Sequence, residues 1–407
     1  MKFKISLVII FSFLLQPSAN AASVTEVKSK VDLGYSGNEQ VSDLLLTKTT
    51  ISLIGTTEAT TSSWIAGTLG GVSDGFITTL SNTGAPLWNL RLGNVGNEIA
   101  TSAAVDVDGS IWIVGASNLL VNQTPSPTPS KLLNPDNVEL SPNIPTNTSL
   151  TKLNVWQVSA SGQLLNSFET QTAGVVNPKK ILITQTGVAV FGNIYEKSTV
   201  KGFFTTISKT GSFTSLIKYG VKQTQLNSAI QNSDGSFSVV GKSADLLLKV
   251  KPLSKGDAVT LKISAKGVLQ QVARATLKST TRSWESISTG LLQGGLVKYA
   301  NKSEAAITKF STLGKPIWND RYLASSAALV AAGSNSWATF VSTGAIAGVP
   351  SWKPKTPSSV ILEFGKKGEV ITASAISGLP VAIARNNEIG TVVITDSGTS
   401  FGIVQIN

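Results

Sequence analysis

Two glutamates occupy matching places in a repeated loop motif. The motif reads LGYSGNE from Leu33 to Glu39 and LGNVGNE from Leu92 to Glu98. Two carboxyl groups at a suitable separation can hydrolyse a glycosidic bond without help from histidine or cysteine. Repeat-equivalent residues can also serve equivalent turns, and this structural interpretation is the one that we favour for Glu39 and Glu98.

Two arginines also share a motif. SNTGAPLWNLR, from Ser81 to Arg91, parallels STLGKPIWNDR, from Ser311 to Arg321. A guanidinium group pairs with a carboxylate through two parallel hydrogen bonds. Arg91 and Arg321 are therefore candidate ligands of an acidic sugar, and Glu39 and Glu98 complete the set of candidate site residues.

The chain contains no histidine and no cysteine. This excludes Ser-His-Asp triads, imidazole bases, thiol catalysis and zinc sites built from thiolates or imidazoles. Asp106, Asp108 and Gly109 look like half a calcium loop, but no distal glutamate follows, so they are interpreted as a hairpin turn. We expect no metal site and no cofactor.

The formal charge is +11, with 34 basic and 23 acidic residues. The lysines are scattered, and Lys179-Lys180 and Lys366-Lys367 are the only doublets. We interpret this excess as a solvated surface; attraction to an anionic polymer is the alternative. No basic helix or aromatic-basic stripe indicates specific nucleic-acid binding.

The first 21 residues are typical of an export signal. Lys2 and Lys4 precede an apolar run from Ile5 to Leu15, and Ala19-Asn20-Ala21 supplies the small-x-small cleavage pattern. The run is too short to span a bilayer as a helix, and no later segment is long and apolar enough. We therefore expect residues 1–21 to be a signal peptide and the mature chain to be secreted or held at the cell surface.

Two β-strand units alternate along the mature chain. The first unit is a strand that ends in a polar turn with glycine; its six full copies are Gly75–Gly84, Val155–Gly162, Gly202–Gly211, Val259–Gly267, Ala305–Gly314 and Ser359–Gly368. The last strand, Phe401 to Ile406, is a seventh copy without the turn. The second unit is a short apolar run, with copies that begin at Ile51, Ile111, Val188, Phe237, Leu296, Trp337 and Thr391.

Seven copies of each unit, spaced mostly at ~40–50 residues, predict an all-β, seven-bladed β-propeller. We take the first unit as the first strand of a blade. The N-terminus then lacks a first strand, and the C-terminal strand supplies one. We therefore expect the last blade to be closed by the C-terminal strand pairing with three N-terminal strands, which hides the strand edges.

A single propeller domain is expected over residues 22–407. A loop insertion rich in Pro, Ser and Asn interrupts it at 117–151. Tryptophans within the strands could line a sugar-binding channel, but packing between blades is the interpretation we favour, because indole rings bury large apolar areas.

The segment from Asp74 to Ser117 resembles the SBBP-type seven-bladed β-propeller repeats of secreted bacterial proteins. It runs in that family's order: strand, turn, tryptophan-bearing strand, Leu-Gly, Asp-Gly turn and a strand ending in glycine. The resemblance implies a propeller fold and specifies no activity. In this predicted order, blades four to six are those whose first units begin at Val259, Ala305 and Ser359. They lack the strand-ending glycine, so their boundaries are less sharply defined.

Short turns and long loops fall on opposite faces of such a ring, and function usually resides in variable loops on a rigid scaffold. We predict that the long-loop face binds the partner. The leading hypothesis is a monomeric, non-catalytic binding module whose partner is a surface glycan or a protein. The alternative is a carboxylate-dependent polysaccharide hydrolase or lyase that uses Glu39 and Glu98.

Overall fold

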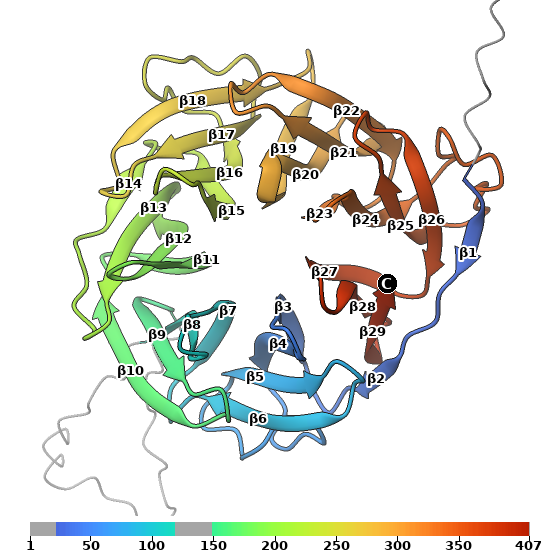
Figure 1. Cartoon of the computed structure of the whole chain (residues 1–407). Coiled ribbons are helices and arrows are strands. Elements are labelled where there is room, and N and C mark those ends of the chain that lie inside the picture. Colours follow the sequence, from blue (N-terminus) through green and yellow to red (C-terminus); the bar gives the residue numbers. More distant parts are fainter. Residues whose placement is uncertain (1–21, 119–148, 407) are drawn as a thin grey trace, which may run out of the picture.

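The computed structural model describes residues 22–118 and 149–406. Within them, seven antiparallel sheets stand around a central axis, as Figure 1 shows. The prediction of an all-β, seven-bladed β-propeller is confirmed. The expected signal peptide and most of the expected insertion lie outside the described residues.

Each blade is a meander that runs outward from the axis. The inner strands are β3 (Gln40–Leu46), β7 (Glu98–Val105), β11 (Val175–Thr184), β15 (Thr224–Gln231), β19 (Thr281–Ser288), β23 (Leu329–Ala332) and β27 (Leu379–Asn386). The second strands are β4 (Thr50–Thr57), β8 (Ile111–Ser117), β12 (Gly187–Glu196), β16 (Phe237–Ser243), β20 (Leu292–Lys298), β24 (Ser336–Ser342) and β28 (Gly390–Asp396). A 3₁₀ turn, η1 (Thr289–Leu291), joins β19 to β20.

Two further rings of strands complete the blades. The third strands are β5 (Asp74–Ser81), β9 (Lys152–Val158), β13 (Thr199–Ser208), β17 (Asp257–Ile263), β21 (Ser303–Phe310), β25 (Ser358–Phe364) and β29 (Ser400–Ile406). The outer strands are β6 (Pro86–Leu92), β10 (Leu164–Gln171), β14 (Ile217–Tyr219), β18 (Leu269–Ala275), β22 (Pro316–Leu323), β26 (Val370–Ile376) and β2 (Val31–Gly34). We number the blades 1 to 7 from the one that begins with β3.

The ring is closed by both ends of the chain, but not in the predicted proportion. Blade 7 consists of β27, β28 and β29 from the C-terminus and β2 from the N-terminus. The pairing of the last strand with an N-terminal strand is confirmed; the expectation of three N-terminal strands is wrong. The segment from Val24 to Glu26 forms β1, which instead adds a fifth, parallel strand to blade 6.

Blade 7 takes three strands from the C-terminus and one from the N-terminus, the opposite of the predicted proportion. Each strand predicted to be the first of a blade is therefore the third. The unit at Gly75–Gly84 lies in β5, which pairs with β4 on one side and β6 on the other. The predicted seven-fold count survives because a shift of two strands leaves the number of blades unchanged. It also leaves the two faces unchanged, because every second connection of a meander lies on the same side.

Burial follows position in the blade. The second strand β8 is buried at all seven residues, whereas the outer strand β10 is mostly exposed. A second strand is covered on both faces by the adjacent blades, which explains the continuous apolar runs. The turns between third and outer strands need a left-handed residue, and Gly84, with φ of 89°, supplies it in the first blade.

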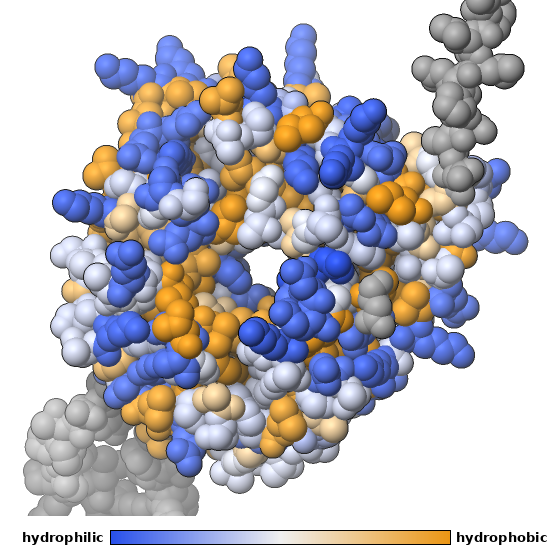
Figure 2. All heavy atoms as spheres, viewed as in Figure 1, coloured by the Kyte–Doolittle hydropathy of each residue, from blue (hydrophilic) through white to orange (hydrophobic). Residues whose placement is uncertain are grey.

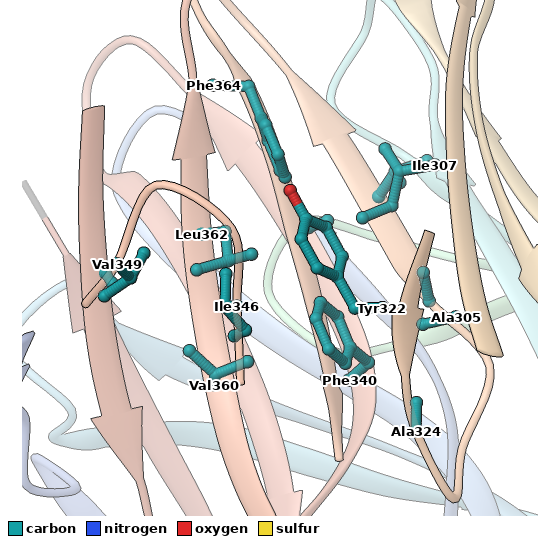
Figure 3. Packing of buried hydrophobic residues seen from close by; sticks show 14 of the residues in the cluster. Ala305, Ile307, Tyr322, Ala324, Phe340, Ile346, Val349, Val360, Leu362 and Phe364 are labelled. Atoms are coloured by element: carbon teal, nitrogen blue, oxygen red, sulfur yellow. The ribbon is translucent and has the colours of Figure 1, made fainter. Parts of the chain in front are cut away.

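Apolar side chains fill the spaces between blades. Figure 3 shows the space between blades 5 and 6, where the rings of Tyr322 and Phe340 stack with their centroids 5.6 Å apart. Leu362 and Ile307 lie beside them. The strand tryptophans Trp112 and Trp337 are buried in similar clusters, as the packing interpretation predicts.

Candidate functional site

The inner strands share an irregularity that shapes the wall of the central channel. All of them except β23 contain a one-residue bulge at the same level, and the extra residues are Ser42, Thr101, Lys179, Asn227, Glu285 and Val381. A bulge redirects the side chains next to it. Figure 2 shows the opening at the ring axis, with hydrophilic and hydrophobic side chains around its edge.

A charged cluster connects blades 1, 2 and 3 in this wall. Lys180 Nζ lies 2.9 Å from Asp43 Oδ2, and Ser102 Oγ donates a hydrogen bond of 2.6 Å to the same oxygen. The backbone N–H of Ala103 also donates to it at 3.2 Å. Asp43 lies in blade 1 and Lys180 lies in blade 3, with blade 2 between them. The ion pair therefore joins two blades that are not neighbours, and Ser102 of blade 2 contacts it.

A second cluster lies in blades 3 to 5. Asn227 Nδ2 donates a hydrogen bond of 2.9 Å to Glu285 Oε2. Burial raises the pKa of Glu285, an effect that nearby lysines, Lys179 among them, oppose. Burial lowers the pKa of Lys179, and Glu285 opposes that shift. Asp43 is thus matched by a cation and Glu285 by an amide.

These channel residues are not among the candidates that the sequence predicts. The scattered lysines predict a solvated surface, whereas the side chains of Lys179 and Lys180 are half-buried in the innermost strand of blade 3. The available signal is a charged residue next to apolar residues in a strand, such as Asp43 before the three leucines of QVSDLLL. Lys180 and Asp43 are 137 residues apart, so only the closed ring brings them together.

Glu39 and Glu98 lie in equivalent loops, immediately before or at the start of inner strands. Glu39 is 3% exposed, and it accepts hydrogen bonds from the backbone N–H groups of Ser36 and Gly37, each at 3.0 Å. Glu98 is 2% exposed, and the N–H of Asn94 approaches its Oε2 at 3.4 Å. All three contacts come from N–H groups of the glutamate's own loop, which fits the turn-forming role that repeat equivalence favours. None of these three contacts joins Glu39 to Glu98.

Burial gives Glu98 an unusual titration. It raises the pKa from 4.5 to about 7, and the N–H of Asn94 partly opposes the shift. The folded state therefore binds the proton more tightly than the unfolded state. The resulting stabilisation is complete below about pH 4.5 and is lost as the pH rises through 7.

Glu98→Gln, which keeps the neutral form at every pH, should stabilise the protein at pH 8 by roughly 2 kcal/mol and have little effect at pH 4. Urea unfolding at both pH values checks this, and the acid measurement serves as the control. A difference between variant and wild type that does not change with pH would contradict the assignment.

The two candidate arginines are engaged and lie in different blades. Arg91, on β6, bonds to Asp74 Oδ2 at 3.4 Å and to the carbonyl oxygens of Ala59 and Ala66, and its side chain is 7% exposed. Arg321, on β22, donates to Tyr299 Oη at 2.7 Å and pairs with Glu304 at 3.3 Å. Arg91 fastens the loop between β4 and β5, and the structure does not bring Arg321 to the same site.

The long-loop face is formed by the connections from second to third strands and from outer to inner strands. Several apolar side chains are exposed in these loops: Val72, Val95, Val221, Leu246 and Leu253. Leu246 and Leu253 lie between β16 and β17, in a loop that also carries Lys249, Lys251 and Lys255. Exposed apolar groups beside lysines are suited to contact with a partner.

Metal-binding and membrane-spanning features can be judged over residues 22–118 and 149–406. In that part of the chain, no three Asp or Glu residues come together as a metal site. It also contains no helix with the length and hydropathy needed to cross a bilayer.

The fold and the channel define the class of the chain as a seven-bladed β-propeller. No family model matches the sequence, and neither does any curated protein. The relationship to SBBP-type repeats therefore stays a prediction.

Solved structures with a similar course of the chain include a protein from Lactobacillus plantarum, with 13% identity, a TM-score of 0.47, and coverage of 88% of this chain and 92% of that one. Drosophila plexin A in complex with semaphorin 1b has 9% identity and a TM-score of 0.44, with coverage of 94% of this chain and 88% of that one. The polysaccharide lyase Uly1 has 10% identity and a TM-score of 0.45, with coverage of 90% of each chain. Similarities this distant carry no argument about function, which has to be argued from the residues.

Proposed function

We propose that the chain is a secreted or cell-surface binding module that engages a glycan or a protein through its long-loop face and the adjacent channel mouth. The observation that carries this proposal is the pairing of the channel carboxylates. Asp43 is held by Lys180 and Ser102, and Glu285 by Asn227. Hydrolysis of a glycosidic bond needs two carboxyl groups that face a common substrate, and these groups face their own partners.

The exposed apolar residues of the long-loop face support the same proposal. Leu246 is 56% exposed and Leu253 is 76% exposed. They protrude from the loop that joins β16 to β17, two strands that are mostly buried, so the loop presents them on a rigid base. A monomer is expected to use them in contact with its partner.

A screen of the mature protein against surface glycans, peptidoglycan fragments and secreted proteins tests the proposal. With a partner in hand, the double variant Leu246→Ser, Leu253→Ser should weaken binding by roughly 10-fold or more. Leu313→Ser is the matched control, because Leu313 is 79% exposed in a short turn on the opposite face. Failure to bind any partner, or equal losses in both variants, would count against the proposal.

The second candidate function is a carboxylate-dependent polysaccharide hydrolase or lyase. The specific observation in its favour is the pKa of Glu98, which burial raises to about 7, the range of a general acid. This candidate requires Glu98→Gln to abolish the turnover of a glycan while the protein stays folded. Unchanged turnover in Glu98→Gln and in Glu39→Gln would remove both residues from consideration.

A further inference from the structure

A cavity of about 470 Å³ lies between blades 4 and 5, and neither Asn227 nor Glu285 of the channel wall lines it. Blade 4 contributes one face of strands β17 and β18, and blade 5 contributes the facing side of β19 to β22, at the top of Figure 1. The small side chains of Ala273 and Ala275 line it on the blade 4 side. In the next gap, by contrast, Tyr322 and Phe340 fill the equivalent space.

Arg282 lines this cavity from β19 and is 8% exposed. Its guanidinium carbon lies 4.3 Å from the centroid of the Trp284 ring. The only side-chain hydrogen bonds found for it within the described residues are long ones, from Nη2 to Thr308 Oγ1 and to Asn319 Oδ1, both 3.5 Å. Its Nε is buried and has no partner there.

Arg282 also differs from the other cations of the lining. Lys262 pairs with Asp234 at 2.8 Å, and Arg274 pairs with Asp257 at 3.4 Å. Among the ion pairs of the described residues, none includes Arg282. Burial lowers the pKa of Arg282 to about 10, so the side chain stays charged at neutral pH. A buried charge without a counter-ion is costly, which makes a second, anionic component the natural complement of this cavity.

The propeller scaffold does not itself require a cation at this place. Arg282 in blade 5 and Glu98 in blade 2 occupy equivalent positions. Each lies two residues before the inner-strand residue that pairs with the glycine of the second strand: Trp284 with Gly295 in blade 5, and Ala100 with Gly115 in blade 2. In blade 2 the equivalent side chain accepts a hydrogen bond from its own loop. Among the described residues, the side chain of Arg282 bonds to strand residues Thr308 and Asn319 and to no loop. Its position therefore serves the cavity rather than the turn.

We propose that this cavity is a binding site for a small carboxylated sugar of hexuronate size. The guanidinium of Arg282 can hold a carboxylate through two parallel hydrogen bonds. Polar side chains also line the cavity: Gln271, Gln293, Asn319, Thr260 and Thr308. Thr260 Oγ1 donates to Gln293 Oε1 at 3.0 Å and Thr308 Oγ1 donates to Asn319 Oδ1 at 2.6 Å, so the amide N–H groups and the hydroxyl lone pairs are what can bond to sugar hydroxyls. The volume lies within the range of small-molecule sites. The lining includes neither the channel residues Asp43, Lys180 and Glu285 nor the exposed leucines Leu246 and Leu253, so the assignment does not rest on the function proposed above.

Calorimetric titration of the folded protein with D-glucuronate tests this assignment, with D-glucose as the neutral analogue. We expect glucuronate to bind and glucose to bind at least roughly 10-fold more weakly. Arg282→Gln should weaken glucuronate binding by roughly 10- to 100-fold. Arg385→Gln is the matched control, because Arg385 also stacks on a tryptophan, Trp337, at 5.3 Å but does not line the cavity.

A second variant keeps the test independent of the charge. Ala273→Phe should fill the cavity and abolish binding while Arg282 stays in place. Several results would overturn the proposal: no binding of glucuronate to the wild type, equal binding to wild type and Arg282→Gln, or equal binding to wild type and Ala273→Phe. Acetate binding as tightly as glucuronate would overturn the assignment of a sugar.

Discussion

Removing residues up to Gly34, which deletes β1 and β2, should unfold the ring or leave it only marginally stable. β2 lies at the outer edge of blade 7, far from the channel, but it is the link by which the N-terminus completes the last blade. Leu33 pairs with Phe401, and Val31 pairs with Ile403. The loss should be comparable with much of the ~5–15 kcal/mol that holds a typical domain together.

The contacts that would be lost extend beyond one strand pair. Leu33 is buried in a cluster with Trp64 of the loop after β4 and Phe401 of β29. The indole N–H of Trp64 donates a hydrogen bond of 2.9 Å to the carbonyl oxygen of Gly34. The N-terminal segment thus connects blade 7 to blade 1. Without it, the outward edge of β29 is open to pairing with another chain.

A shorter truncation is the control for this prediction. Deleting residues only up to Val27 removes β1, a parallel strand at the edge of blade 6, and keeps β2. Blade 6 retains four strands, so the urea midpoint should fall much less than in the longer truncation. The elution volume in size-exclusion chromatography should match that of the protein with β1 in place. Equal midpoints for the two truncations would contradict the role assigned to β2.

The sequence revealed the number of blades more reliably than their boundaries. Repeats such as Gly75–Gly84 recur once per blade whichever strand is counted first, so seven copies predict seven blades. The boundary depends instead on which strand faces the axis. The outer strand β10, LLNSFETQ, is rich in polar residues, whereas the wholly buried second strand β8, IWIVGAS, is mostly apolar. This difference in polarity identifies which strand lies at the outer edge, and so where a blade ends.

Blade 5 shows a related limit. The repeat predicts a second strand that begins at Leu296 and has no strand-ending glycine, whereas β20 begins at Leu292 and contains Gly295 opposite Trp284. The channel residues and Arg282 were hidden for a different reason. Their partners come from other blades, and no local pattern encodes a contact such as that between Asp43 and Lys180, which only ring closure creates.

Most second strands contain a glycine opposite the bulge of the inner strand, and replacing it should cause a large loss of stability. Gly115→Ala should destabilise the protein by about 3 kcal/mol or more, even though it adds a single methyl group. A Cβ at Gly115 would lie 1.8 Å from the carbonyl oxygen of Ile99 and 2.7 Å from the ring of Trp156. Backbone on one side and a buried indole on the other leave no direction in which the methyl group fits.

The close approach follows from the bulge in the inner strand. In blade 2 the register shifts between Ala100 and Ser102, and Ala100 pairs with Gly115. The same arrangement recurs in blade 1, where a Cβ at Gly55 would lie 2.0 Å from the carbonyl oxygen of Gln40. In blades 1 and 2 the glycine therefore gives the bulge its space, whereas in blade 7 Thr395 stands opposite Pro380 at the bulge. The bulge shapes the channel wall. A side chain at this position should disturb the channel as well as the stability of the blade.

Gly34→Ala is the matched control, because a Cβ at Gly34 meets no atom within 4 Å. Urea unfolding should show a midpoint near that of the wild type for Gly34→Ala and a much lower one for Gly115→Ala. If both variants unfold at the same urea concentration, the bulge does not need the glycine. The recurrence of this residue in successive blades would then have to come from something other than the space between the first two strands.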